Sequence, residues 1–102
     1  GDGKKRVRTV AVVNGGGGDA GFLALAAECG ADCYVTGDVP HHVQLMAAET
    51  GMPIVILQHY AAERIYMERL KRILTEFAAA GAVDACFEVS ESERDPVRTE
   101  EV

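Results

Sequence analysis

The sequence is poor in cysteine and has no long hydrophobic run. Its three cysteines are an odd and low number for 102 residues, so the fold is not built on a disulfide framework. No apolar stretch approaches the roughly 20 residues that a membrane-spanning helix needs, and no secretory signal is visible. We therefore expect reduced thiols, a cytoplasmic location and no membrane partner.

Positive charge is also scarce. Ten basic side chains stand against sixteen acidic ones, which gives a net charge of −6. An acidic domain repels a phosphate backbone, so we expect no nucleic-acid partner. The one basic cluster, Lys4 to Arg8, is interpreted as a solvated lead-in to a strand. Cys29 and Cys33 have no second pair with which to complete a zinc site.

What is present suits one domain with a modest core. The chain is 48% hydrophobic and 25% charged, which is ordinary for a globular protein of this length. It opens with GDGKKRV and has no initiator methionine. We expect either a trimmed chain or a piece of a longer protein, and the sequence leaves both open.

Strand-like runs alternate with helical patterns along the chain. Asp19 is placed to cap the first helix and Gly30 to end it. Pro40 suits the first turn of the second helix, and Gly51 is placed to end that helix. Strict alternation predicts βαβ units with right-handed crossovers. Strands are predicted at residues 7–13, 32–36, 53–57 and 84–90, and helices at residues 20–29, 40–49 and 60–80.

These elements predict an α/β fold with a mostly parallel four-stranded sheet flanked by helices. The strands are nearly continuous apolar runs, as expected when helices cover both faces of a sheet. We divide the chain into a lead-in at residues 1–6, an α/β lobe at 7–90 and a charged tail at 91–102.

Three predicted loops leave the sheet at the carboxyl ends of its strands, where ligands gather in open α/β sheets. The first loop contains four consecutive glycines before a helix begins. Their backbone N–H groups can hold an anion or a phosphate. The loop matches neither the dinucleotide fingerprint nor the P-loop, so a tight, flexible turn is the favoured interpretation. The four glycines are Gly15, Gly16, Gly17 and Gly18.

The second loop, TGDVPHH, offers Asp38, His41 and His42. Adjacent residues at a helix start point about 100° apart, so at most one of these histidines faces a site shared with Asp38. The plainer interpretations are a turn or cap role for Asp38 and a solvated side chain for His41. His42 suits the surface and a site wall equally well.

The third loop, QHYAAER, places His59 and Glu63 four residues apart. If the helix runs unbroken, Glu63 falls inside its apolar stripe, where a carboxylate costs several kcal/mol unless it is paired or binds metal. Residues at i and i+4 point the same way and can share one metal ion. The alternative, slightly favoured by spacing alone, is a hydrogen-bonded pair at the helix N-terminus. The stripe consists of Tyr66, Leu70, Ile73, Leu74 and Phe77.

Together these motifs resemble the GTP cyclohydrolase I type 2-like family, also called the Nif-three-like dinuclear metal-binding family. Its signature is a glycine-rich turn, then TG-acid…HH, then GH-aromatic-x-x-E at a helix start. The counterparts here are NGGGG, TGDVPHH and QHYAAER, and Gln58 stands where the family usually has glycine. The resemblance covers residues 7–97, including a closing Ser92, Asp95 and Pro96.

The resemblance implies that His59 and Glu63 are metal ligands, with Glu63 typically bridging two divalent ions. It does not distinguish zinc, iron, manganese or magnesium. The family's other ligands, a histidine pair and an aspartate, come from an N-terminal half that has no counterpart here. His41 and His42 match a C-terminal segment that lines the site. The chain then corresponds to the C-terminal lobe of a two-lobed protein whose relatives form hexameric rings, so a homo-oligomer is expected.

Two functional hypotheses follow from this resemblance. In the first, the full protein is a metal-dependent hydrolase of a purine nucleotide such as GTP. Asp38 and His42 would orient water or substrate, and the glycine turn would contact an anionic group. In the second, the domain is a non-enzymatic metal-handling or protein-interaction module. With only two ligands present, we expect the chain alone to be inactive and to need the N-terminal lobe or other subunits.

Overall fold

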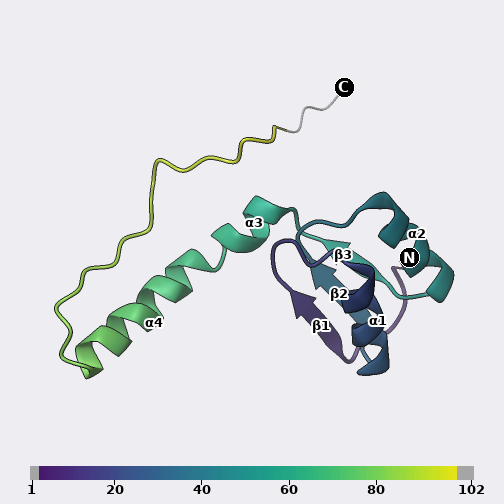
Figure 1. Ribbon diagram of the computed structural model, residues 1–102, viewed down its shortest axis with the longest axis horizontal. Helices are drawn as coiled ribbons and strands as arrows, with labels where there is room; N and C mark the ends of the chain where they lie inside the picture. Colours follow the sequence, from purple (N-terminus) through teal and green to yellow (C-terminus); the bar gives the residue numbers. More distant parts are fainter. Residues whose placement is uncertain (1–2, 99–102) are drawn as a thin grey trace. The chain divides into compact units, whose positions relative to one another are not determined.

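The computed structural model describes residues 3–98, so residues 1–2 of the predicted lead-in and 99–102 of the predicted tail lie outside it. The chain divides into two compact units, one ending at Glu63 and the other beginning at Arg64. None of the described helices is long and apolar enough to cross a membrane. The elements, labelled in Figure 1, are β1 (Val10–Val13), α1 (Ala20–Glu28), β2 (Cys33–Thr36), α2 (His41–Thr50), β3 (Ile54–Ile56), α3 (His59–Arg64) and α4 (Met67–Ala80).

The first unit contains a parallel three-stranded sheet in the order β1-β2-β3. Val12 is aligned with Val35, and Val35 with Val55. The predicted α/β class and parallel pairing are therefore confirmed. Sequential strand order places the ends of β1, β2 and β3 at one edge of the sheet, as the loop analysis required.

The predicted fourth strand, residues 84–90, is wrong. Residues 82–98 contain no helix or strand. A strand exists only where its backbone N–H and C=O groups pair with a neighbouring strand, and this segment has no such partner among the described residues. The alternating apolar side chains of this segment predicted a strand, but the segment does not pair with another strand among the described residues.

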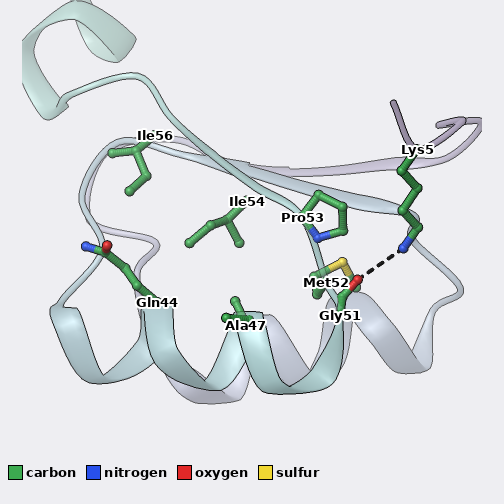
Figure 2. A pocket seen from close by; sticks show the side chains of 9 residues that line it. Lys5, Gln44, Ala47, Gly51, Met52, Pro53, Ile54 and Ile56 are labelled. Atoms are coloured by element: carbon green, nitrogen blue, oxygen red, sulfur yellow. Dashed lines mark hydrogen bonds between the residues drawn. The ribbon is translucent and has the colours of Figure 1, made fainter. Parts of the chain in front are cut away.

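The core of the first unit lies on one face of the sheet. Leu23 from α1 and Val43 and Ala47 from α2 pack around Tyr34 of β2, which is 1% exposed. Figure 2 shows α2 running beneath the strands. Both crossovers join neighbouring parallel strands in sequence, and right-handed connections of that kind place both helices on the same face. Within this unit, the expectation of helices on both faces is not met.

The ends of the first two helices follow the predicted signals. The Asp19 carboxylate accepts a hydrogen bond from the Gly21 N–H at 2.7 Å and caps α1. Gly30 follows α1 with a φ of +75°, and Gly51 ends α2 with a φ of +70°. Pro40 is the residue immediately before α2, so it lies one position outside the helical turn predicted for it. These positive φ angles favour glycine, which has no Cβ to clash with the backbone.

The single helix predicted for residues 60–80 is instead two helices, α3 and α4. Ile65 and Tyr66 form a turn between them. Both residues have weaker helix propensity than alanine or leucine, and Ile65 is 83% exposed, so no packing holds it in a helix. The break means that Glu63 does not belong to the same helix as the apolar stripe of α4.

Candidate functional site

The glycine turn after β1 is joined to the loop after β2 through one backbone carbonyl. The Gly15 carbonyl accepts hydrogen bonds from the N–H groups of Gly37 and Asp38, at 3.0 and 3.1 Å. The Thr36 hydroxyl approaches the same oxygen at 3.4 Å. Two loops far apart in sequence therefore form one surface at the carboxyl edge of the sheet.

Close packing explains why this turn is made of glycine. A Cβ on Gly17 would lie 2.6 Å from the Thr36 hydroxyl oxygen, and a Cβ on Gly18 would overlap the Asp38 carbonyl. The Gly17 carbonyl also accepts a 2.6 Å hydrogen bond from the buried Tyr34 hydroxyl. The turn is tight, as predicted. It is not the flexible turn that was expected, because the carbonyls of Gly15 and Gly17 both accept hydrogen bonds. Anion binding by its N–H groups stays a prediction.

A histidine between two carboxylates stands at the centre of the site. His59 Nδ1 lies 2.6 Å from Asp38 Oδ2, and His59 Nε2 lies 3.1 Å from Glu63 Oε1. The side chains of His59, Asp38 and Glu63 are 48%, 59% and 53% exposed, so all three are open to solvent. The sequence correctly indicated that His59 and Glu63 would be neighbours, because residues at i and i+4 share a helix face.

The two carboxylates favour the charged form of the imidazole. The hydrogen bond from His59 to Asp38 is the main reason that the pKa of His59 lies above its ordinary value of 6.5. The nearby negative charge of Glu63 raises the same pKa, while desolvation lowers it. Protonation of this histidine is therefore favoured.

Gly15 brings the backbone against this histidine–glutamate pair. Its φ is +64°, and a Cβ there would lie 2.7 Å from Glu63 Oε1 and 3.3 Å from His59 Nε2. Any larger residue would push into the space that the two side chains occupy. The first residue of the glycine turn is thus part of the site wall.

A hollow of about 380 Å³ lies between the glycine turn and the start of α2. Asp38 and His42 both line it, whereas His41 does not. This arrangement agrees with the expectation that at most one of the two histidines faces a site shared with Asp38. The other lining residues are Gly16, Gly18, Asp19, Ala20, Pro40 and Val43.

Glu63 and Asp38 differ in the structure from what the sequence predicted. Glu63 is half exposed, so it is not the buried carboxylate that the unbroken helical wheel suggested. Asp38 bonds to His59, a partner that the sequence argument did not consider. The order of the strands holds the missing signal, because loops that follow neighbouring parallel strands lie side by side.

A second hollow, of about 520 Å³, lies between β3 and α2 in the first unit. Figure 2 shows Ile54 pointing from β3 toward Ala47 of α2, and Lys5 reaching the Gly51 carbonyl. The Lys5 ammonium donates that hydrogen bond at 3.1 Å. Lys5 is the one ionisable residue among those that line this hollow.

The donor set at His59 and Glu63 suits part of a metal site. Ligands held 2.0–2.2 Å from one zinc ion stand roughly 3.0–3.4 Å apart at tetrahedral to octahedral angles. The 3.1 Å between His59 Nε2 and Glu63 Oε1 falls in that range, although a hydrogen bond has the same length. Within residues 3–98, no three side chains of ligating types converge on one point. The pair therefore fits two positions of a coordination sphere.

A comparison with protein-family models shows to which family the chain belongs. Residues 1–96 match the family described as Duf34/NIF3 (NGG1p interacting factor 3). The chain belongs to this family. The matched range includes the glycine turn, the TGD loop and the His59–Glu63 pair.

Individual relatives agree with the family match. A GTP cyclohydrolase 1 type 2 homolog of Staphylococcus aureus is 30% identical over 96 residues, covering 94% of this chain and 25% of the relative. A NIF3-like protein 1 of Dictyostelium discoideum is 29% identical, covering 92% and 25%. The crystal structure of Staphylococcus aureus protein SA1388 superposes with a TM-score of 0.77 at 31% identity, covering 89% and 29%. The chain thus spans about a quarter of the length of the curated Duf34/NIF3 relatives.

Proposed function

We propose that this chain forms one wall of a divalent metal site, with His59 and Glu63 as its ligands. The observation that carries the proposal is the 3.1 Å approach of His59 Nε2 to Glu63 Oε1 on solvent-open side chains. A histidine nitrogen and a carboxylate oxygen at this separation can occupy neighbouring positions around one cation. By the family resemblance, Glu63 would be shared between two divalent ions in the complete site.

The rest of the coordination sphere comes from outside these residues. Zinc sites need at least three protein ligands, and two-metal hydrolytic sites need more. Only two candidate ligands meet here among the described residues. We assign the remaining ligands to the N-terminal lobe of the same protein or to other subunits of a homo-oligomer. The three free cysteines suit a cytoplasmic setting.

The complete protein is proposed to be a metal-dependent hydrolase of a purine nucleotide such as GTP. A bound divalent metal would act as a Lewis acid and lower the pKa of a bound water. Asp38 and His42 line the adjoining hollow and orient water or substrate there. The turn at Gly15, Gly16, Gly17 and Gly18 precedes the N-terminus of α1, where an anionic group of the substrate is favoured.

The deciding experiment measures GTP turnover by the complete gene product. The protein is stripped with a chelator and assayed with zinc, iron, manganese or magnesium added singly. We expect turnover that returns with metal and falls by more than about 100-fold in Glu63→Gln, because loss of a ligand exceeds the effect of an outer-shell change. Glu49→Gln, an exposed glutamate at the end of α2, serves as the matched control.

Absence of metal-dependent turnover from the complete protein would reject the hydrolase. If Glu63→Gln still abolished metal binding in that case, the domain would be the non-enzymatic metal-binding or protein-interaction module. The family description names an interacting factor, which is the observation in favour of that second function.

A further inference from the structure

The two ring nitrogens of His59 are engaged from opposite sides by carboxylates on different elements. Asp38, in the loop after β2, contacts Nδ1 at 2.6 Å. Glu63, one turn along α3, contacts Nε2 at 3.1 Å. A neutral imidazole carries only one proton, so it can donate to one of the two carboxylates and must present a lone pair to the other.

The backbone that carries Asp38 is held by more contacts than the side chain of Glu63. Its N–H donates to the Gly15 carbonyl at 3.1 Å, and the neighbouring Gly37 N–H donates to the same oxygen at 3.0 Å. On its other side, Gly18 packs so closely on the Asp38 carbonyl that no Cβ would fit. Asp38 is therefore carried on a loop fixed by the glycine turn, whereas Glu63 ends a flexible side chain on a six-residue helix.

We propose that Asp38 is a positioning residue that accepts the Nδ1–H of His59 and thereby leaves the Nε2 lone pair facing Glu63 for a cation. This inference rests on the proposed metal site and adds to it the residue that selects the tautomer. Metal-binding histidines almost always donate their second ring N–H to a carboxylate, carbonyl or water, which fixes both tautomer and ring orientation. Asp38 supplies that acceptor here.

The opposite tautomer shows why the positioning matters. Without Asp38, the described partner that remains for the ring is Glu63, at Nε2. The proton then moves to Nε2 and donates to Glu63, which blocks the nitrogen and the carboxylate at once. Asp38 thus prevents a hydrogen bond between His59 Nε2 and Glu63 that would occupy both proposed ligand atoms.

The first test reads the tautomer without any metal. Long-range ¹H–¹⁵N correlation spectra of the ¹⁵N-labelled chain distinguish protonated from unprotonated ring nitrogens at a pH where His59 is neutral. The chain has three histidines, so His41 and His42 serve as internal references. We expect Nδ1–H at His59 in the native chain, Nε2–H in Asp38→Ala, and Nδ1–H in Asp38→Asn, whose amide oxygen still accepts a hydrogen bond.

The second test titrates the same samples with Zn²⁺ and follows the His59 resonances. Asp38→Ala should weaken zinc binding by about 10- to 100-fold, whereas Asp38→Asn restores most of the affinity. Asp84→Ala, an exposed aspartate in the second unit, is the control and should change neither tautomer nor affinity. Urea unfolding midpoints confirm that each variant is folded.

The outcomes separate this inference from the proposed function. A native chain with Nε2–H at His59 overturns the positioning role and needs no variant to do so. Unchanged zinc affinity in Asp38→Ala also overturns it, while leaving the metal site standing. The expected tautomer change without any zinc binding by the native chain upholds the positioning role and rejects metal binding by His59 and Glu63 in the chain alone. The chelator and metal-addition assay of the complete protein then decides its metal role.

Discussion

Gly15 meets several demands that no other residue can satisfy together. Its φ of +64° favours glycine, its carbonyl holds the loop of Asp38, and its missing side chain leaves room for Glu63. Gly51 has a similar φ of +70°, yet nothing lies within 4 Å of a Cβ built there. The two glycines therefore share a backbone conformation and differ in what surrounds them.

Alanine substitution should separate these two effects. Gly15→Ala and Gly51→Ala each force a left-handed alanine, which costs roughly 1–2 kcal/mol in free energy of unfolding, measured by urea denaturation. Only Gly15→Ala should also shift the His59 ring resonances, because its Cβ displaces the Glu63 carboxylate. An equal shift in Gly51→Ala would contradict this assignment of the site wall.

At the same scale, the sequence predicted contacts within a helix and missed contacts between loops. The i, i+4 spacing was enough to place His59 beside Glu63. The Asp38 contact depends on β2 and β3 being neighbours, which no local pattern encodes. Gln58 has a φ of +64°, a conformation that favours glycine, the residue that the family resemblance places at that position.

At the scale of elements, an aspartate fixes where β1 meets β2. Asp32 Oδ2 accepts hydrogen bonds from the N–H groups of Arg8 and Thr9, both at 2.9 Å. The Asp32 N–H donates in turn to the Thr9 carbonyl at 2.8 Å. These bonds join the residues just before β1 to the residue just before β2. They lie one residue before Val10 and Cys33, the first aligned pair of the two strands.

This contact makes stability depend on pH in the acid range. The hydrogen bond from Thr9, followed by that from Arg8, holds the pKa of Asp32 below its ordinary value of 3.8. A lowered pKa in the folded state means that the stabilisation is complete above pH 3.8 and is lost as the pH falls through the folded value. Urea midpoints from pH 6 to 2.5 should fall more steeply for the native chain than for Asp32→Asn, which has no charge there. Parallel curves would contradict the role of Asp32.

Element prediction succeeded where the signal was local. The caps at Asp19, Gly30 and Gly51 depend on a few neighbouring residues, and all three lie where expected. The strand at residues 84–90 and the unbroken helix at residues 60–80 depended on partners elsewhere in the protein. Those two predictions failed because periodicity does not show whether pairing and packing are available.

At the scale of the whole molecule, the described residues supply only part of the proposed metal site. The chain spans about a quarter of the length of its curated relatives. Its two candidate ligands are His59 and Glu63, which contact each other. Both ligands belong to the first unit, together with Asp38 and the glycine turn. In the proposed site, a metal bound to this chain alone would have two protein ligands, and water would fill the other positions.

The chain alone should bind divalent metal weakly. We expect calorimetry with Zn²⁺ or Mn²⁺ to give an affinity more than about 100-fold below that of the complete protein, since missing ligands cost more than missing outer-shell partners. His59→Ala should remove the weak binding, and His41→Ala should not. Tight binding of two ions per chain, abolished by His59→Ala, would instead show that pairing of chains completes the site.

The anchored carbonyls of the glycine turn also bear on the order in which the chain folds. Glycine loses more backbone entropy on folding than any other residue, and four in a row make this turn costly to order by itself. The Tyr34 hydroxyl holds the Gly17 carbonyl, and the N–H groups of Gly37 and Asp38 hold the Gly15 carbonyl. These groups lie in β2 or in the loop directly after it. The turn can therefore become ordered only when β2 has paired with β1, so the wall of the site appears and disappears together with the sheet.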